Sequence, residues 1–148
     1  MAEPIEILLV EDYEPDVQLL FTLLKKHRIT NKVHVIDNGA DALDFLFCRG
    51  AFAGRSSERP PAAVLLDIRI PKVDGWEILR QLKEDPKTRD IPVVMTSGSL
   101  FPQEIERSLE FGANGCMEKP IKLEGLRSLF NSLGFSWSLI VSEVPRKN

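Results

Sequence analysis

The chain has 148 residues, of which 43% are hydrophobic and 28% are charged, a composition typical of one soluble globular domain. Its 22 acidic and 19 basic residues give a net charge of −3, and the dispersed basic residues predict no nucleic-acid partner. The apolar runs are far shorter than the roughly 20 residues that span a bilayer, and the acidic N-terminus does not look like a signal peptide. We therefore expect a cytoplasmic protein with no membrane segment.

Short apolar runs alternate with amphipathic stretches along the chain, the pattern of repeated strand–helix units. In chain order, the predicted elements are a strand at 5–10, a helix at 15–26, a strand at 33–37, a helix at 40–49, a strand at 63–67, a helix at 76–83, a strand at 92–97, a helix at 103–111, a strand at 115–118 and a helix at 123–133. The polar segment 50–61 is expected to be a surface loop. The fold class is α/β, with a doubly wound five-stranded parallel sheet.

Polar side chains follow four of the predicted strands at their carboxyl ends, which open onto one edge of such a sheet. These residues are Glu11, Asp12, Asp67, Ser97 and Lys119. Neighbouring carboxylates repel one another unless a hard cation such as Mg²⁺ takes them as oxygen ligands. A carboxylate cluster flanked by a lysine and a hydroxyl suits phosphoryl transfer, so we predict Mg²⁺ and a phosphoryl group at this edge.

The acidic residues have distinct roles in this hypothesis. Asp67 ends the clearest strand and is assigned as the nucleophile, because carboxylates form aspartyl-phosphate intermediates. Its ordinary alternative is to cap the following loop. Glu11 and Asp12 would hold Mg²⁺ together with Asp67; the alternative is a solvated acidic start to the first helix, which the helix dipole favours.

The remaining two groups would contact the phosphoryl oxygens. Lys119 is a compact cation able to neutralise phosphoryl charge, and its alternative is an ordinary surface lysine. Ser97 is preferred to Thr96 as the hydroxyl donor because Ser97 stands at the strand terminus.

Other chemistries lack their signatures in this sequence. Neither nucleotide-binding glycine loop occurs, and Cys48 and Cys116 lack metal-ligand spacing, so we expect reduced, apolar cysteines. An Mg²⁺-dependent aspartyl-phosphate phosphatase is the rival reading, but it needs a second Asp two residues after Asp67, where Arg69 stands. A flavodoxin-like cofactor binder is a weaker rival, because no phosphate loop follows the first strand.

Nearly the whole chain carries a recognisable set of segments. They are LLVED at 8–12, LLDIRIP at 65–71, Asp74-Gly75, IPVVMTSG at 91–98, Gly112-Ala113 and Lys119-Pro120. Together they resemble the receiver domain of two-component response regulators. The resemblance implies a flavodoxin-like sheet in the order 2-1-3-4-5. It also implies that Asp67 accepts a phosphoryl group from a sensor histidine kinase or a phosphotransfer protein.

The same resemblance assigns the site residues. The implied Mg²⁺ ligands are Asp12, Asp67 and the backbone carbonyl of Arg69, with Glu11 acting mostly through water. The implied phosphoryl-binding groups are Ser97, the Gly98 backbone N–H and Lys119, and the Lys119-Pro120 peptide is expected to be cis. The protein would be a signalling module that catalyses its own phosphorylation and slow dephosphorylation, and not a turnover enzyme.

Two residues depart from the family pattern. Cys116 stands three residues before the strand-five lysine, where family members usually carry an aromatic switch residue, so that switch cannot operate here. Arg69 stands two residues past the acceptor, at a position that in relatives controls access of the hydrolytic water. A long cation there is expected to shield the aspartyl phosphate and slow its loss.

The C-terminal segment 134–148 is apolar near its start, with Phe135 and Trp137, and too short for an output domain. We expect one receiver domain over 1–148, with this extension packing on its own domain or taking part in a homodimer through the fourth and fifth units. The tail and the 50–61 loop are similar to those of the small stand-alone regulators of bacterial and cyanobacterial phytochromes. A phytochrome-type kinase is therefore the expected partner.

Overall fold

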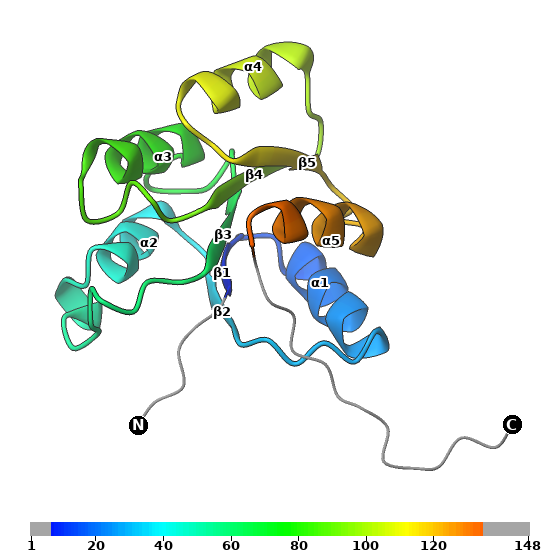
Figure 1. Cartoon of the computed structure of the whole chain (residues 1–148), viewed down its shortest axis with the longest axis horizontal. Coiled ribbons are helices and arrows are strands. Elements are labelled where there is room, and N and C mark those ends of the chain that lie inside the picture. Colours follow the sequence, from blue (N-terminus) through cyan, green and yellow to red (C-terminus); the bar gives the residue numbers. More distant parts are fainter. Residues whose placement is uncertain (1–6, 135–148) are drawn as a thin grey trace, which may run out of the picture.

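A computed structural model of the chain describes residues 7–134. Within this range one parallel sheet has the strand order β2-β1-β3-β4-β5, which confirms the predicted doubly wound α/β fold (Figure 1). Its strands are β1 (Ile7–Val10), β2 (Val33–Ile36), β3 (Ala63–Asp67), β4 (Val93–Ser97) and β5 (Gly115–Glu118). The expectations for residues 5–6 and for the apolar tail beyond residue 134 lie outside the described residues.

Helices cover both faces of the sheet (Figure 1). They are α1 (Glu14–Lys26), α2 (Gly39–Leu46), α3 (Gly75–Glu84), α4 (Pro102–Glu110) and α5 (Leu123–Ser132). The apolar sides of α1 and α5 pack on one face, and those of α2 and α3 pack on the other. Residues of β1, β3 and β4 are all buried, as expected for strands covered on both faces.

Helix α4 is attached more weakly than its neighbours. It lies beside β5 and α3 (Figure 1), and Ser108 is its one buried residue. Arg107 places its guanidinium over the Trp76 ring of α3, 4.5 Å from the ring centroid. Much of this attachment is thus polar or cation–π in nature, and the apolar burial that fixes the other helices is small here.

The predicted helix at 40–49 is wrong at its C-terminal end, because α2 ends at Leu46. Cys48 has a positive φ of 53°, which a continuing right-handed helix does not allow. The predicted loop then begins with a short 3₁₀ helix, η1 (Gly50–Phe52). Arg55 ties this loop to α2, since its guanidinium lies 3.6 Å from the Phe45 ring centroid.

Helix α3 begins in close contact with β3. Asp74 caps α3 by accepting a hydrogen bond from the Glu77 N–H at 2.9 Å. The backbone of Gly75 passes so close to β3 that an added Cβ would lie 2.4 Å from the Asp67 carbonyl oxygen. Glycine at position 75 therefore lets α3 begin directly against the strand that carries Asp67.

The described helices are too short or too polar to cross a bilayer.

Candidate functional site

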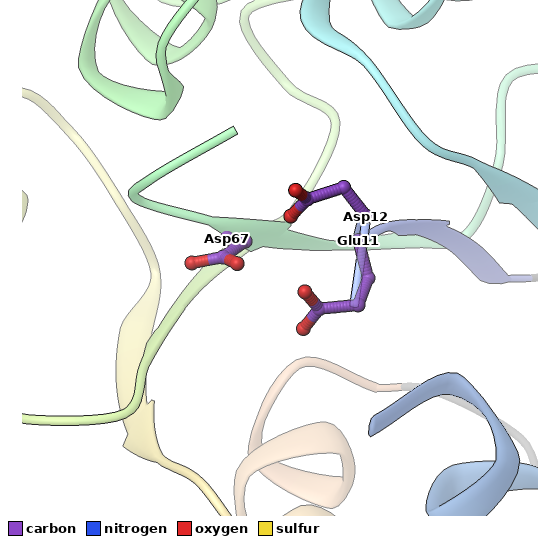
Figure 2. A group of neighbouring side chains, drawn as sticks. All are labelled: Glu11, Asp12 and Asp67. Carbon is purple, nitrogen blue, oxygen red and sulfur yellow. The ribbon is translucent and has the colours of Figure 1, made fainter. Parts of the chain in front are cut away.

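Three carboxylates meet at the carboxyl edge of the sheet (Figure 2). Glu11 and Asp12 follow β1, Asp67 ends β3, and β1 pairs with β3 in parallel register. Figure 2 shows the carboxylates of Glu11 and Asp12 directed toward Asp67. One oxygen from each residue lies within 4.8 Å of the others. Glu11 and Asp67 are buried, whereas Asp12 is exposed, so the cluster has a dry floor and an open side.

Lys119 closes the cluster from the far side. It follows β5, two strands away from β3, and the cis Lys119-Pro120 peptide predicted from the sequence is present. Its Nζ lies 2.8 Å from Glu11 Oε1, 3.1 Å from Asp67 Oδ2 and 3.2 Å from Asp16 Oδ2. The contact with Asp16 was not predicted. Asp16 lies in the first turn of α1, and no local spacing links it to Lys119.

Burial and charge shift the ionisation of two of these groups. Burial raises the pKa of Glu11 to about 7, and the neighbouring Asp67 carboxylate adds to this rise against the opposing effect of Lys119. For Lys119, burial alone lowers the pKa, but hydrogen bonds and charge from Glu11 and Asp67 outweigh burial and hold the pKa above its usual range. Lys119 therefore stays a cation, and Glu11 is poised between its two charge states near neutral pH.

The donor set fits a hard divalent cation. Its groups are carboxylate oxygens from neighbouring elements, one side is open to solvent, and the crowded negative charge is what a divalent ion relieves. The described site residues offer no thiol or imidazole among these ligands, which favours Mg²⁺ or Mn²⁺ over Zn²⁺.

Ser97 lies at the end of β4 and is completely buried. Its Oγ donates to the Ser99 carbonyl at 2.9 Å and accepts from the Arg69 guanidinium at 3.0 Å. Arg69 in turn donates its backbone N–H to Asp67 Oδ1 at 3.1 Å. These hydrogen bonds connect Ser97 to Asp67 through Arg69. Thr96, the rival hydroxyl, is also buried, but its pleat position matches Val94 on the α1 and α5 side.

Arg69 and Gly98 complete the edge. The second Arg69 guanidinium nitrogen pairs with Glu104 of α4 at 3.0 Å, a contact that sequence reasoning missed because no local spacing connects residues 35 positions apart. A Cβ added at Gly98 would meet no atom within 4 Å, so packing does not demand glycine there.

The arrangement of sheet, acids, hydroxyl and lysine has counterparts among known proteins. The family model of the response regulator receiver domain matches residues 7–131. The chain belongs to the response regulator receiver family. Receiver domains are modules of two-component signalling and not classical turnover enzymes; they bind divalent metal and interact with histidine kinases or phosphotransfer proteins. The resemblance inferred from the segments around Asp67 and Lys119 is confirmed.

Two relatives match this receiver over most of its length. Rcp1 of Synechocystis sp. is 32% identical over 134 residues, with 90% of this chain and 89% of Rcp1 covered. A probable methanogenesis regulatory protein, FilR2 of Methanothrix harundinacea, is 33% identical over 135 residues, covering 91% of this chain and 84% of FilR2.

Solved structures of receivers share the same fold. The bacteriophytochrome response regulator AtBRR is 39% identical, with a TM-score of 0.82 over 95% of this chain and 100% of AtBRR. The Mn²⁺-bound form of Rcp1 is 30% identical, with a TM-score of 0.74 over 93% and 100% of the two chains. Phosphorylated RcpA, a cyanobacterial phytochrome response regulator, is 32% identical, with a TM-score of 0.71 over 89% of each chain.

Proposed function

We propose that the protein is a response regulator in which Asp67 accepts a phosphoryl group from a phosphohistidine of a sensor histidine kinase. The observation that carries this proposal is the position of Asp67: a buried carboxylate 3.1 Å from the Lys119 ammonium and clustered with Glu11 and Asp12. The phosphorylated form of the related RcpA and the Mn²⁺-bound form of Rcp1 support it.

In the proposed transfer, an oxygen of the Asp67 carboxylate attacks the donor phosphorus. An O–P bond forms, the P–N bond breaks, and the departing imidazole keeps the electron pair and takes a proton from solvent. Lys119 follows the negative charge on the phosphoryl oxygens, and Ser97 and the Gly98 N–H are the proposed hydrogen-bond donors to these oxygens. In the slow loss of the phosphoryl group, water attacks phosphorus, the bond between phosphorus and the Asp67 oxygen breaks, and inorganic phosphate leaves while the carboxylate is restored.

Asp12, Asp67 and the backbone carbonyl of Arg69 are the proposed Mg²⁺ ligands, with Glu11 contributing through water. When bound, Mg²⁺ supplies positive charge that offsets the carboxylates and the incoming phosphoryl oxygens. Glu11 and Asp67 are buried, whereas Asp12 is exposed, so the ion would enter the site from the side of Asp12.

Intact-mass measurement after incubation with phosphoramidate and Mg²⁺ tests the acceptor. The parent chain is expected to gain one phosphate, and Asp67→Asn is expected to gain none. Asp90→Asn is the matched control and should label like the parent. It removes an exposed carboxylate just before the amino end of β4, whereas the site lies at the carboxyl ends of the strands. Equal labelling of the parent and Asp67→Asn would overturn the assignment, because the phosphate would then reside elsewhere.

The phosphatase interpretation is less well supported. It requires an acid two residues after Asp67, and the Arg69 side chain at that position donates to Ser97 and pairs with Glu104. A cation held this way cannot donate a proton to a leaving group at neutral pH.

We also propose that the chain acts as a stand-alone regulator for a phytochrome-type kinase. The match covers 100% of the solved chains of AtBRR and Rcp1, which supports a regulator built on one receiver domain. Phosphotransfer from a purified bacteriophytochrome kinase, compared with an unrelated kinase, tests the pairing. Equal rates from both kinases would contradict it.

A homodimer through the fourth and fifth units is the proposed assembly. Three large apolar side chains at four-residue spacing support it, because they line one exposed side at and along α4. They are Phe101, Ile105 and Leu109, with exposures of 57%, 39% and 57%. Light scattering of the parent and Leu109→Asp tests the assembly: the variant is expected to be monomeric, and an unchanged mass would contradict this surface.

A further inference from the structure

Among the described residues of the site, Arg69 contacts β3, β4 and α4. The Arg69 guanidinium donates to Ser97 Oγ at the end of β4 and pairs with Glu104 Oε2 on α4, each at 3.0 Å. Its own backbone N–H donates to Asp67 Oδ1 in the loop after β3. Arg69 thus links the candidate phosphoryl acceptor to α4, the helix whose exposed side carries Ile105 and Leu109.

The hydrogen bonds of Ser97 are fully committed in this state. Its one O–H is donated to the Ser99 carbonyl, and its oxygen accepts from Arg69 at 3.0 Å and from the Ser99 N–H at 3.3 Å. A hydroxyl has one proton to donate, so Ser97 must leave the Ser99 carbonyl before it can donate to a phosphoryl oxygen. Phosphoryl binding therefore requires the hydrogen bonds of Ser97 to rearrange, and Arg69 is one of the two donors to its oxygen.

The Arg69–Glu104 ion pair is suited to be exchanged. The Arg69 side chain is 62% exposed and the Glu104 side chain is 16% exposed, and an ion pair with one solvated partner is weakened because water screens it. A phosphorylated Asp67 carries more negative charge than its free carboxylate and offers several acceptor oxygens. Guanidinium groups bind carboxylate and phosphoryl oxygens in the same two-pronged geometry, so the larger negative charge and the additional oxygens of phosphorylated Asp67 favour the phosphoryl group.

Resting on the proposed function, we propose that Arg69 transmits phosphorylation to α4 by exchanging Glu104 for the phosphoryl oxygens on Asp67. In the unphosphorylated protein Arg69 holds the first turn of α4 through Glu104. On phosphorylation the guanidinium turns to the phosphoryl group, Glu104 loses its partner, and α4 loosens from the domain. This exchange would replace the aromatic switch, because Cys116 has no aromatic ring at that position.

The attachment of α4 explains why this exchange has an effect. Ser108 is the one buried residue of the helix, and the Arg107 guanidinium over Trp76 is a further anchor. Glu104 is also the third helical residue, and its Oε1 accepts from the Phe101 N–H at 3.2 Å. Loss of the Arg69 contact therefore acts on the end of the helix that is nearest the site.

The two partners of the ion pair predict opposite effects on phosphoryl affinity. Beryllium fluoride with Mg²⁺ serves as the probe, because it occupies an aspartate carboxylate as a tetrahedral phosphoryl stand-in that does not hydrolyse. Glu104→Gln removes the competitor for Arg69 and should tighten probe binding about two- to fivefold, the ratio an exposed ion pair supports. Arg69→Ala removes the group that binds the probe and should weaken binding by a similar factor.

Two readouts are compared in these variants. Fluorine NMR titration gives the dissociation constant of the probe, and hydrogen exchange over residues 102–110 reports the stability of α4. Exchange in α4 should rise on probe binding in the parent. In Glu104→Gln and Arg69→Ala it should be high before the probe is added and change little afterwards.

Glu84→Gln is the matched control. It removes an exposed carboxylate that pairs with Arg80 on α3, away from the site, and should leave both readouts at parental values. If the probe binds but Glu104→Gln and Arg69→Ala shift the dissociation constant in the same direction, or not at all, the exchange is overturned while the acceptor role of Asp67 stands. If the parent does not bind the probe at all, the proposed function fails and this inference fails with it.

Discussion

Glu11 and Asp67 come from different strands and share one counter-ion, since Lys119 Nζ lies 2.8 Å from Glu11 Oε1 and 3.1 Å from Asp67 Oδ2. Both carboxylates are buried, and burial together with the Asp67 carboxylate raises the pKa of Glu11 to about 7. The metal-free site therefore holds more negative charge than Lys119 balances. Proteins accept such strain where a ligand later relieves it.

Removing one carboxylate is expected to stabilise the metal-free protein. Asp67→Asn keeps the shape of the side chain but removes its charge, while Lys119 retains Glu11 and Asp16 as partners. The free energy of unfolding in EDTA at pH 7.5 should rise by about 1 kcal/mol, since one pKa unit of coupling corresponds to about 1.4 kcal/mol. Urea unfolding measures it, with Glu58→Gln, which removes an exposed carboxylate from the loop after η1, as an unchanged control. A less stable Asp67→Asn would show that Lys119 compensates the cluster completely.

The raised pKa of Glu11 predicts how Mg²⁺ affinity depends on pH. A carboxyl whose pKa is raised on folding contributes stability that is complete below about pH 4.5, its unfolded value, and is lost as pH rises through about 7. Mg²⁺ binds the deprotonated cluster, so each pH unit below 7 should weaken binding by up to about tenfold. Above pH 7 the affinity should level off.

Calorimetric titration of Mg²⁺ at half-unit pH steps checks this profile. Glu11→Gln has no proton to lose at this position and should flatten the pH dependence between pH 5.5 and 7, although its affinity at high pH is lower. A parental profile without any slope in this range would mean that Glu11 stays ionised in the folded protein.

The sheet and the first set of site residues could be predicted because both depend on local signals. The strand 63–67 is a continuous apolar run that ends in an acid, and β3 has these bounds in the structure. Helix starts were less accurate by about one residue, since the caps Asn38 and Asp74 decide them. The end of α2 was missed because the positive φ of Cys48 has no signature in helical periodicity.

The polar contacts that connect the site to the rest of the molecule could not be predicted in the same way. The Arg69–Glu104 pair and the Asp16–Lys119 pair join residues far apart in the sequence, and their geometry depends on the crossing of helices over the sheet edge. Alternation in β4 did place Ser97 at the strand end, but not its bond to Arg69. The sequence pattern thus indicated which groups gather, and the structure adds which of them are already paired.

Gly75 is predicted to be intolerant of any side chain. An added Cβ would lie 2.4 Å from the Asp67 carbonyl oxygen and 2.8 Å from Ile68 Cα, both of them backbone atoms that cannot move aside cheaply. Gly75→Ala should lower the free energy of unfolding by about 1–3 kcal/mol, the usual range for overpacking. Gly98→Ala is the matched control, because its Cβ meets no atom within 4 Å. Equal loss of stability in both variants would argue against the close approach of α3 to β3.

The last prediction concerns the lifetime of the phosphorylated state. Arg69 reaches from the loop after β3 to Ser97, and its backbone N–H donates to Asp67 Oδ1, so we expect its side chain to shield phosphorus on Asp67 from water. Arg69→Ala labelled with phosphoramidate should therefore lose its phosphate several-fold faster than the parent, followed by intact mass after removal of the donor. Glu84→Gln should lose it at the parental rate, and an Arg69→Ala protein that is no faster would remove Arg69 from the control of hydrolysis.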